Sequence, residues 1–308
     1  MKGTIIEILK KNGDFVSGET LSQHLGISRV SVWKHIGKLQ QMGYGIDAGP
    51  RGYRLAPAED VLMPWEFPGR QSRMHHFART ASTMDMARKL AREGAPDFSV
   101  VVADIQEKGR GRLSRRWLSD AGGLYFTLIL RPKLPAAQGY LVNFSASLVL
   151  AETLRDQFGI EAMVKWPNDI LVDGRKLSGM LSEMEAEGDM ATFVNIGIGL
   201  NVNNDPTADE PSAISLSALK GARVSRREVL AAFLDRLEER IEKKGFENAV
   251  AAWKRYTMTI GREVTVVTTR ESVEGVARDV DDTGALILAL ADGSTRRVVY
   301  GDCFHRDL

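Results

Sequence analysis

Apolar positions near the N-terminus recur every three or four residues, a spacing that predicts amphipathic helices. The first of these, around Ile5 and Leu9, ends at Gly13. A second helix is predicted over GETLSQHLG and a third over RVSVWKHIGKLQQMG, with Ser17 and Ser28 as their N-caps. Two short helices joined by a turn that contains glycine indicate a helix-turn-helix, whose later helix is presented to DNA.

The stretch YGIDAGPRGYRL follows and predicts two short strands, which makes the segment a winged helix-turn-helix. Residues 1–55 carry eight Lys and Arg against four Asp and Glu, a net charge of +4, whereas the remainder carries −3. This charge favours DNA binding, with a protein-binding winged helix as the alternative. The sequence fits packing of Trp33 in a core or an interface about as well as contact of Trp33 with DNA. The residues expected at the DNA are Ser28, Arg29, Ser31, Lys34 and Arg51.

The pattern changes in the centre of the chain, where apolar runs of strand length alternate with turns. SVVVADI and GLYFTLIL predict strands, Thr83 to Arg92 predicts a helix with Ser82 as its N-cap, and SASLVLAETLRDQFG predicts a second helix. The runs VKW, ILV, KLSGMLSEME and FVNIGIGLNV are separated by turn residues, which is typical of hairpins. We therefore expect an α+β body with a mixed sheet.

The last part of the chain predicts helices and then short strands. Ser225 and Glu228 form a capping box before a helix that reaches about Lys244, and a further helix covers FENAVAAWKRY. REVTVVTT, VEGVARDV, ALILALA and STRRVVY then predict a small β-barrel. The expected parts are the winged helix-turn-helix at 1–56, a proline-rich linker at 57–69, a central domain at 70–256 and a C-terminal domain at 257–308.

Composition narrows the class of protein. With 44% apolar and 26% charged residues in 308, and no apolar run near the ~18 residues of a membrane span, the chain reads as an ordinary globular protein. Its one cysteine, Cys303, excludes an internal disulfide framework and fits a reducing cytoplasm, which is the expected location. No His and Cys cluster has metal-site spacing, so no protein-bound metal is expected.

The most basic stretch is QEKGRGRLSRRW, from Gln106 to Trp117, between the two predicted strands SVVVADI and GLYFTLIL. Gly109 and Gly111 let backbone N–H groups approach an anion, and guanidinium groups offer two-pronged donors to phosphate. The position between strands excludes a phosphate site at a helix N-terminus, and no P-loop or dinucleotide fingerprint occurs. Taken alone, the stretch is also compatible with a solvated surface loop.

A second feature is Lys176, which lies in the apolar frame of Leu177, Met180 and Leu181. A buried ammonium group is costly without an anionic partner, and Asp169 lies seven residues earlier across a predicted hairpin. Such a pair beside a basic loop suits a reaction that builds charge on a phosphate or acyl oxygen. Spacing alone favours a structural ion pair beside a surface loop.

Together these motifs resemble a known family. KGRGRLSRRW with GGLYFTLIL, then VKWPNDILVDGRKLSGMLSE, then NIGIGLNVN is similar to the biotin–protein ligases, and the N-terminal segment makes the chain resemble their bifunctional ligase and repressor form. The resemblance implies a C-terminal SH3-like barrel and ATP- and Mg²⁺-dependent formation of biotinyl-5′-AMP. It also implies transfer of biotin to a lysine of a biotin carboxyl carrier protein, binding to operator DNA, and a homodimer when the adenylate is bound.

The resemblance also assigns roles to residues. Arg112 is implied to contact the acyl phosphate, Lys176 the biotin carboxylate and α-phosphate, and Asp169 is implied to orient the acceptor lysine. The other residues implied at the biotin are Ser82, Thr83, Gln106, Gly109, Arg110, Gly111 and Gly179. Those implied at the ATP or adenylate, besides Lys176, Arg110 and Arg112, are Trp117, Asn168, Asn201 and Arg306.

One position departs from the family pattern. The motif that usually reads Ser-Thr-Asn is here Ser82-Thr83-Met84, so a polar contact is missing or comes from elsewhere.

Two other functions remain as alternatives. One is a transcription factor whose ligase-like body only senses a small acid, which Lys176 and the complete basic loop disfavour. The other is a lipoate ligase, which KWPND and GRGR disfavour.

Overall fold

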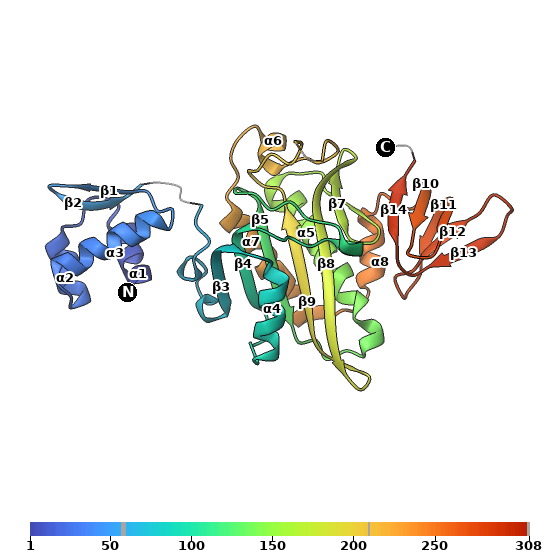
Figure 1. Cartoon of the computed structure of the whole chain (residues 1–308), viewed down its shortest axis with the longest axis horizontal. Coiled ribbons are helices and arrows are strands. Elements are labelled where there is room, and N and C mark those ends of the chain that lie inside the picture. The colour runs from blue at the N-terminus through green and yellow to red at the C-terminus, as the bar shows by residue number, and fades with distance from the viewer. Residues whose placement is uncertain (57–59, 209, 307–308) are drawn as a thin grey trace. The chain divides into compact units, whose positions relative to one another are not determined.

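The computed structural model describes residues 1–56, 60–208 and 210–306, so residues 57–59 of the expected linker lie outside the described residues. The chain divides into two compact units. One comprises residues 1–72 with 225–227, and the other comprises residues 73–224 with 228–308. Figure 1 follows both along the chain and shows a mixture of helices and sheets, in agreement with the predicted α+β class.

The first unit is a winged helix-turn-helix, as predicted. It contains α1 (Lys2–Asn12), α2 (Gly18–Leu25), α3 (Arg29–Gln41), and the hairpin of β1 (Ile46–Gly49) and β2 (Gly52–Leu55). The hydroxyl oxygens of Ser17 and Ser28 accept hydrogen bonds from backbone N–H groups in the first turns of α2 and α3. The helices enclose a core that includes Ile5, Leu21, Val32, Ile36 and Leu39.

Part of the predicted linker packs against this core. Val61 and Met63 are buried in it, and they are followed by the short 3-10 helices η1 (Pro64–Glu66) and η2 (Gln71–Arg73). The buried Glu66 carboxylate accepts hydrogen bonds from Lys10 at 2.5 Å, from Tyr44 at 2.7 Å and from Arg227 at 2.7 Å. Ion pairing therefore connects this segment to the helices before it and to the start of a helix much later in the chain.

The second unit is built on a seven-stranded sheet in the order β3-β4-β5-β9-β8-β7-β6. β3 runs parallel to β4 and the other neighbours are antiparallel, so the sheet is mixed, as predicted. The strands are β3 (Met74–Thr80), β4 (Ser99–Gln106), β5 (Leu124–Leu130), β6 (Met163–Lys165), β7 (Asp169–Val172), β8 (Arg175–Glu187) and β9 (Met190–Leu200).

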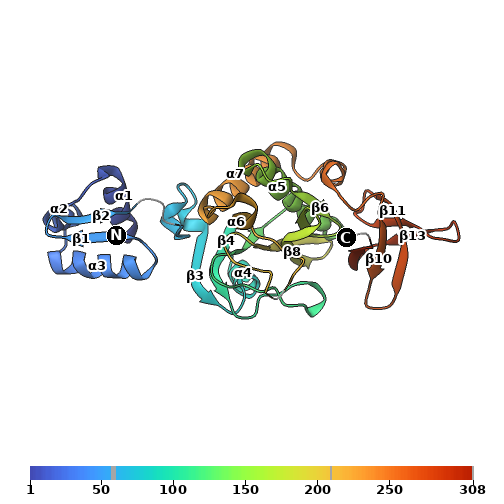
Figure 2. The same cartoon turned by 90° about the horizontal axis from the view of Figure 1, so that it is seen from above.

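Helices cover both faces of this sheet. Figure 2 shows α4 (Thr83–Arg92) on one face and α5 (Tyr140–Phe158) and α7 (Arg226–Lys244) on the other. Short helices complete the domain: η3 (Arg112–Ser114), η4 (Ala136–Gln138), α6 (Leu216–Lys220), α8 (Ala249–Trp253) and η5 (Lys254–Tyr256). α4 packs on one face of β9, and the strand is buried from Phe193 to Leu200.

The chain ends in a five-stranded antiparallel sheet in the order β13-β12-β11-β10-β14. Its strands are β10 (Glu263–Val267), β11 (Ser272–Val280), β12 (Leu286–Ala289), β13 (Thr295–Val298) and β14 (Asp302–His305). A hydrogen bond links it to the central domain: the indole N–H of Trp166, directly after β6, donates to the carbonyl of Gly284, between β11 and β12, at 2.9 Å. No helix in the described part of the chain is long and apolar enough to cross a membrane.

Candidate active site

A pocket of about 450 Å³ opens over the centre of the larger sheet. Residues from the N-terminus of α4, the loop between β4 and β5, strands β7 to β9 and strand β14 line it. Twelve residues singled out from the sequence are among the lining residues: Ser82, Thr83, Gln106, Arg110, Gly111, Arg112, Trp117, Asn168, Asp169, Lys176, Gly179 and Asn201. The pocket therefore gathers segments that are far apart in the chain.

Lys176 and Asp169 lie on the floor of the pocket and form the ion pair that the hairpin suggested. The ammonium group of Lys176 is 2.8 Å from Oδ1 of Asp169, with 35% of the lysine side chain and 19% of the aspartate side chain exposed. A register shift between Ile170 and Leu171 accompanies the pairing of β7 with β8. The floor thus offers a half-buried cation whose partner is reachable from the pocket.

Two glycines let an aromatic ring lie against this floor. Gly179 on β8 and Gly199 on β9 face each other in the antiparallel register. A Cβ at Gly199 would lie 2.3 Å from two atoms of the Trp117 indole, and one at Gly179 would lie 2.9 Å from it. The indole N–H of Trp117 is buried and has no hydrogen-bond acceptor among the described residues. Any side chain at these two positions would displace the ring.

The basic loop, residues 107–123 between β4 and β5, forms the cover of the pocket, and side-chain ion pairs hold it. Arg110 pairs with Asp85 at 3.0 Å and with Glu183 at 3.1 Å, and Arg115 pairs with Asp302 of β14 at 2.5 Å. Gly109 is at a close approach, because a Cβ there would lie 2.3 Å from the carbonyl oxygen of Trp117. The loop is therefore a pocket cover and not a solvated surface loop.

Arg112 differs from the other loop arginines in this pocket. Its guanidinium donates to the amide oxygen of Asn168 at 3.1 Å, and the carboxylate of Asp302 is 3.9 Å away. Burial lowers the pKa of Arg112, while the charges of Asp302 and Asp169 oppose that shift. A partly buried guanidinium whose nearest described ion-pair partner is 3.9 Å away is well suited to an anionic ligand.

The start of α4 supplies neutral polar groups. Gln106 accepts hydrogen bonds at its side-chain oxygen from the backbone N–H of Thr83 at 2.8 Å and from its hydroxyl at 3.0 Å. Ser82 is the N-cap of α4, as predicted, but its side chain makes no capping bond. Its hydroxyl is buried without a partner among the described residues, so it is available to a ligand.

Met84 replaces the expected polar contact with an apolar one. Its side chain is buried and lies directly over Gly197 of β9, where a Cβ would be 2.7 Å from the methionine sulfur. The thioether thus fills the space that the glycine leaves open.

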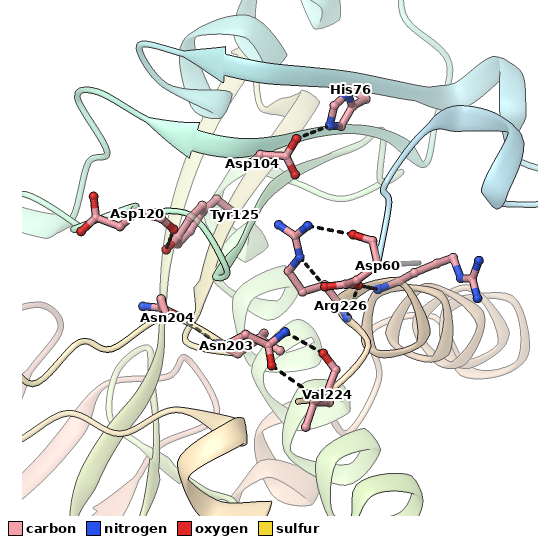
Figure 3. A network of polar contacts seen from close by, with 11 residues as sticks. Asp60, His76, Asp104, Asp120, Tyr125, Asn203, Asn204, Val224 and Arg226 are labelled. Carbon is pink, nitrogen blue, oxygen red and sulfur yellow. Dashed lines mark hydrogen bonds and ion pairs between the residues drawn. The ribbon is translucent and has the colours of Figure 1, made fainter. Parts of the chain in front are cut away.

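The loop after β9 forms the far side of the pocket. The side-chain amide of Asn204 donates to Oδ1 of Asn201 at 3.1 Å, and the side chain of Asn203 pairs with both backbone polar groups of Val224 at 2.8 and 2.9 Å (Figure 3). The two hydrogen bonds between Asn203 and Val224 hold these residues together. Asn201 and Asn204 line the pocket.

Two residues named from the sequence are not among the pocket's lining residues. Gly109 belongs to the basic loop but does not line the pocket. Arg306 pairs with Glu274 at 3.1 Å, and half of its side chain is exposed. Conversely, five residues that line the pocket were not predicted to belong to the site: Gly197, Gly199, Lys165, Asp302 and Cys303. Glycine at every second position of NIGIGL is the signal that indicates a bare strand face.

The chemistry available in the pocket is that of fixed charges. Burial raises the pKa of the Cys303 thiol to about 12, so the thiol is neutral near pH 7 and is not a nucleophile there. The described residues contain no group of three or more His, Cys, Asp and Glu placed to hold a metal ion. What remains is a lysine–aspartate pair, a buried arginine and backbone glycines, an arrangement that binds and stabilises negative charge.

The residues expected at DNA lie on α3 and the wing of the first unit. Arg29, Lys34 and Arg51 are exposed, and Trp33 is 65% exposed, which excludes packing of its ring in the core of that unit. Ser28 and Ser31 also bond to each other at 3.0 Å in the N-cap of α3. The guanidinium of Arg51 lies 4.4 Å from the centre of the Phe15 ring.

Three family models match separate parts of the chain: an HTH domain over residues 2–54, the biotin/lipoate A/B protein ligase family over 76–203, and the biotin protein ligase C-terminal domain over 259–306. The bifunctional ligase/repressor BirA of Bacillus subtilis is 36% identical, with 95% of each chain covered. BirA of Escherichia coli is 29% identical, with 91% of this chain and 90% of that protein covered.

Among solved structures, the biotin protein ligase from Aquifex aeolicus in complex with biotin and ATP matches with a TM-score of 0.63 and 28% identity. The match covers 76% of this chain and 98% of the Aquifex chain. The similarity to the Bacillus protein extends over nearly the whole length of both chains. The chain therefore belongs to the biotin protein ligase family, in the form that carries an N-terminal helix-turn-helix domain.

Proposed function

We propose that this protein joins biotin to a lysine of a biotin carboxyl carrier protein, through biotinyl-5′-AMP formed from biotin and ATP, and that it represses transcription of biotin genes in response to biotin. The observation that carries the ligase function is the pocket, in which Lys176, Arg112 and Asp169 converge beneath a basic loop. Full-length similarity to bifunctional ligase/repressors supports the pairing of this pocket with a DNA-binding domain.

In the first step, the biotin carboxylate attacks the α-phosphate of ATP and releases pyrophosphate. Two anions must approach each other, so catalysis of this step is mostly positioning and charge stabilisation. Lys176 would bind the carboxylate and an α-phosphate oxygen, and Arg112 would bind the acyl phosphate. Arg110, Gly109 and Gly111 would hold the loop over the mixed anhydride and exclude water from it.

The remaining assignments divide the pocket into two ends. Ser82, Thr83, Gln106 and Gly179 would contact biotin, while Trp117, Asn168 and Asn201 would contact the adenylate. Mg²⁺ would accompany the ATP phosphates. Arg306 is exposed and paired with Glu274, so its contact with ATP would require this ion pair to open.

In the second step, the amine of the acceptor lysine must lose a proton before it attacks the acyl carbon. Asp169 would orient that amine and accept its proton, because its carboxylate lies at the pocket surface beside Lys176. The mixed anhydride then breaks at its acyl–oxygen bond, which forms the amide and releases AMP. Both steps use the same floor.

Transfer of radiolabelled biotin from biotin and ATP to an isolated carrier domain tests the ligase function. We expect transfer by the wild-type chain and its loss in Arg112→Ala. Lys108→Ala is the matched control, because it removes one charge from the same loop at an exposed position that does not line the pocket. Absence of transfer by the intact wild-type chain would contradict the proposal.

The repressor function would use the winged helix at 1–56, with Ser28, Arg29, Ser31, Lys34 and Arg51 at the DNA. The further domain limits we propose are 57–69 for the linker, 70–256 for the catalytic domain and 257–308 for the SH3-like domain. We expect a cytoplasmic protein that dimerises when the adenylate is bound and then binds a two-fold operator.

Selection from random DNA duplexes, followed by binding in a salt series, tests this function. We expect binding that weakens with salt and tightens when biotin and ATP are added. Arg29→Ala should lower affinity for the selected sequence about tenfold or more without changing biotin transfer. Binding that is indifferent to biotin and ATP would contradict a biotin-responsive repressor.

A further inference from the structure

A second cavity of about 380 Å³ lies on the same sheet face as the main pocket, lined by Arg88, Glu183, Met184, Glu185, Phe193 and Asn195. Three elements, α4, β8 and β9, contribute residues to both cavities. On α4, Met84 and Arg88 are one turn apart, and on β8 and β9 the residue pairs Leu181 with Glu183 and Gly197 with Asn195 are two positions apart. Residues two apart on a strand share a face, so the two cavities adjoin.

Asn195 is the unusual residue of this second cavity. Its side chain is fully buried, and neither its amide nitrogen nor its amide oxygen has a hydrogen-bond partner among the described residues. An unpaired buried polar group costs about 1–3 kcal/mol of stability. A leucine would fill the same space without that cost, so the amide indicates a bound group that pairs with it.

The charges around Asn195 indicate what kind of group that is. Arg88 is paired with Glu183, and Arg92 is paired with Glu185 at 2.5 Å. These charges are already balanced, whereas the amide of Asn195 offers one acceptor and two donor hydrogens. A neutral ligand group that carries both an N–H and a carbonyl is the complement of this amide, and a cyclic urea has this form.

Met84 stands between Asn195 and the main pocket. Its side chain lines the main pocket and covers Gly197. Gly197 is two residues from Asn195 on β9 and lies on the same face of the sheet. A methionine side chain has three rotatable bonds and adapts to irregular spaces, so it can move aside when a ligand enters. Since Gly197 has no side chain of its own, the thioether is the part of this boundary that can be displaced.

We propose that Asn195 is a recognition residue for the urea ring of biotin, reached when Met84 turns away from Gly197. The amide N–H donates to the urea oxygen and the amide oxygen accepts from a urea N–H. This inference rests on the proposed function, because it presumes that biotin enters with its ring toward Ser82 and Met84. It deepens that function by adding a binding residue on β9 outside the basic loop and the start of α4.

Calorimetric titration of the full chain with biotin, desthiobiotin and ATP tests the inference in Asn195→Leu. We expect the Kd to rise about tenfold or more for both biotin and desthiobiotin, since both carry the urea ring and one hydrogen bond contributes roughly this factor. The Kd for ATP should stay within about twofold of wild type. The unliganded variant should melt at the same temperature or higher, because an unpaired buried amide has been removed.

A biotin Kd within about twofold of wild type, with an unchanged or raised melting temperature, would show that Asn195 only holds water and would overturn the inference. If Asn195→Leu does not fold, Asn195→Ser serves instead, and wild-type affinity for biotin in that variant contradicts the inference equally. Failure of the wild-type chain to bind biotin would instead overturn the proposed function, so the two failures are distinguishable.

Discussion

The floor and the cover of the main pocket are held by different forces. The floor consists of β7, β8 and β9, in which backbone hydrogen bonds fix the register that brings Gly179 opposite Gly199. The cover is the basic loop, which is attached to its surroundings by arginine–carboxylate pairs such as Arg115 with Asp302. The floor is held by a continuous series of backbone hydrogen bonds, and the cover is held by separate ion pairs between side chains.

This difference suggests a division of labour. Ladder hydrogen bonds are internal and do not compete with a ligand, so Lys176 keeps its position whether or not substrate is present. An ion pair that is partly exposed contributes only ~0–1 kcal/mol, so the phosphate and carboxylate groups of substrates can replace it. We infer that the floor, together with Arg112 of the loop, carries the chemistry and that the ion pairs of the cover govern how long the intermediate is retained.

The largest effect is expected from Lys176→Ala on the floor. Removing one preorganised cation from the reacting groups should slow adenylate formation by about 10²–10³. Pyrophosphate release under saturating biotin and ATP measures this rate. Lys133→Ala is the control, because that lysine is exposed and does not line the pocket. A loss smaller than about fivefold would show that the floor does not carry the chemistry.

A smaller effect is expected from Gly199→Ala. The added methyl group would overlap the indole of Trp117, whose nearest atoms lie 2.3 Å from the Cβ position, so the ring must leave the floor. We expect affinity for ATP to fall about tenfold, measured by calorimetry, while the unfolding midpoint changes little. Gly37→Ala is the control, since a Cβ there meets nothing within 4 Å. Unchanged affinity in Gly199→Ala would mean that the position of the indole does not matter.

The smallest effect is expected on the cover, from Asp302→Asn. This change removes the charge that anchors Arg115, and half of that arginine side chain is exposed, so stability should fall by less than about 1 kcal/mol. We expect release of bound adenylate to become a few times faster and less sensitive to salt, as measured by stopped-flow dissociation. Glu271→Gln, which removes the partner of Arg296 on the same small sheet, should not alter release. Equal changes in both variants would argue against a specific anchor.

Much of the fold could be predicted because its signals are local. Helical spacing, serine N-caps and glycine stops located α1, α2 and α3, and turn residues located the hairpins of β6 to β9. Among the described α-helices and strands, β3, α6 and β14 were not predicted, and neither were the 3-10 helices η2, η3 and η4. β3 is an edge strand with a single neighbour and little apolar alternation, while α6 and β14 contain only five and four residues.

The site was predicted in part for a similar reason. Lys176 and Asp169 are close in sequence, so one hairpin places them together, and the family motif marks both. Asp302 and Asn195 were missed because their importance depends on contacts between segments distant in the chain. The pairing of Asp302 with the loop appears only after the strands are assembled, and so does the lack of a partner for the Asn195 amide among the described residues.

The most direct test of adenylate chemistry in this pocket is native mass spectrometry of the protein after incubation with biotin, ATP and Mg²⁺ and removal of free ligand. We expect wild-type protein to retain one biotinyl-5′-AMP per chain and Lys176→Ala to retain none. Wild-type protein that retains no biotinyl-5′-AMP and releases no pyrophosphate, although it binds biotin, would contradict this chemistry and leave only a biotin-binding regulator.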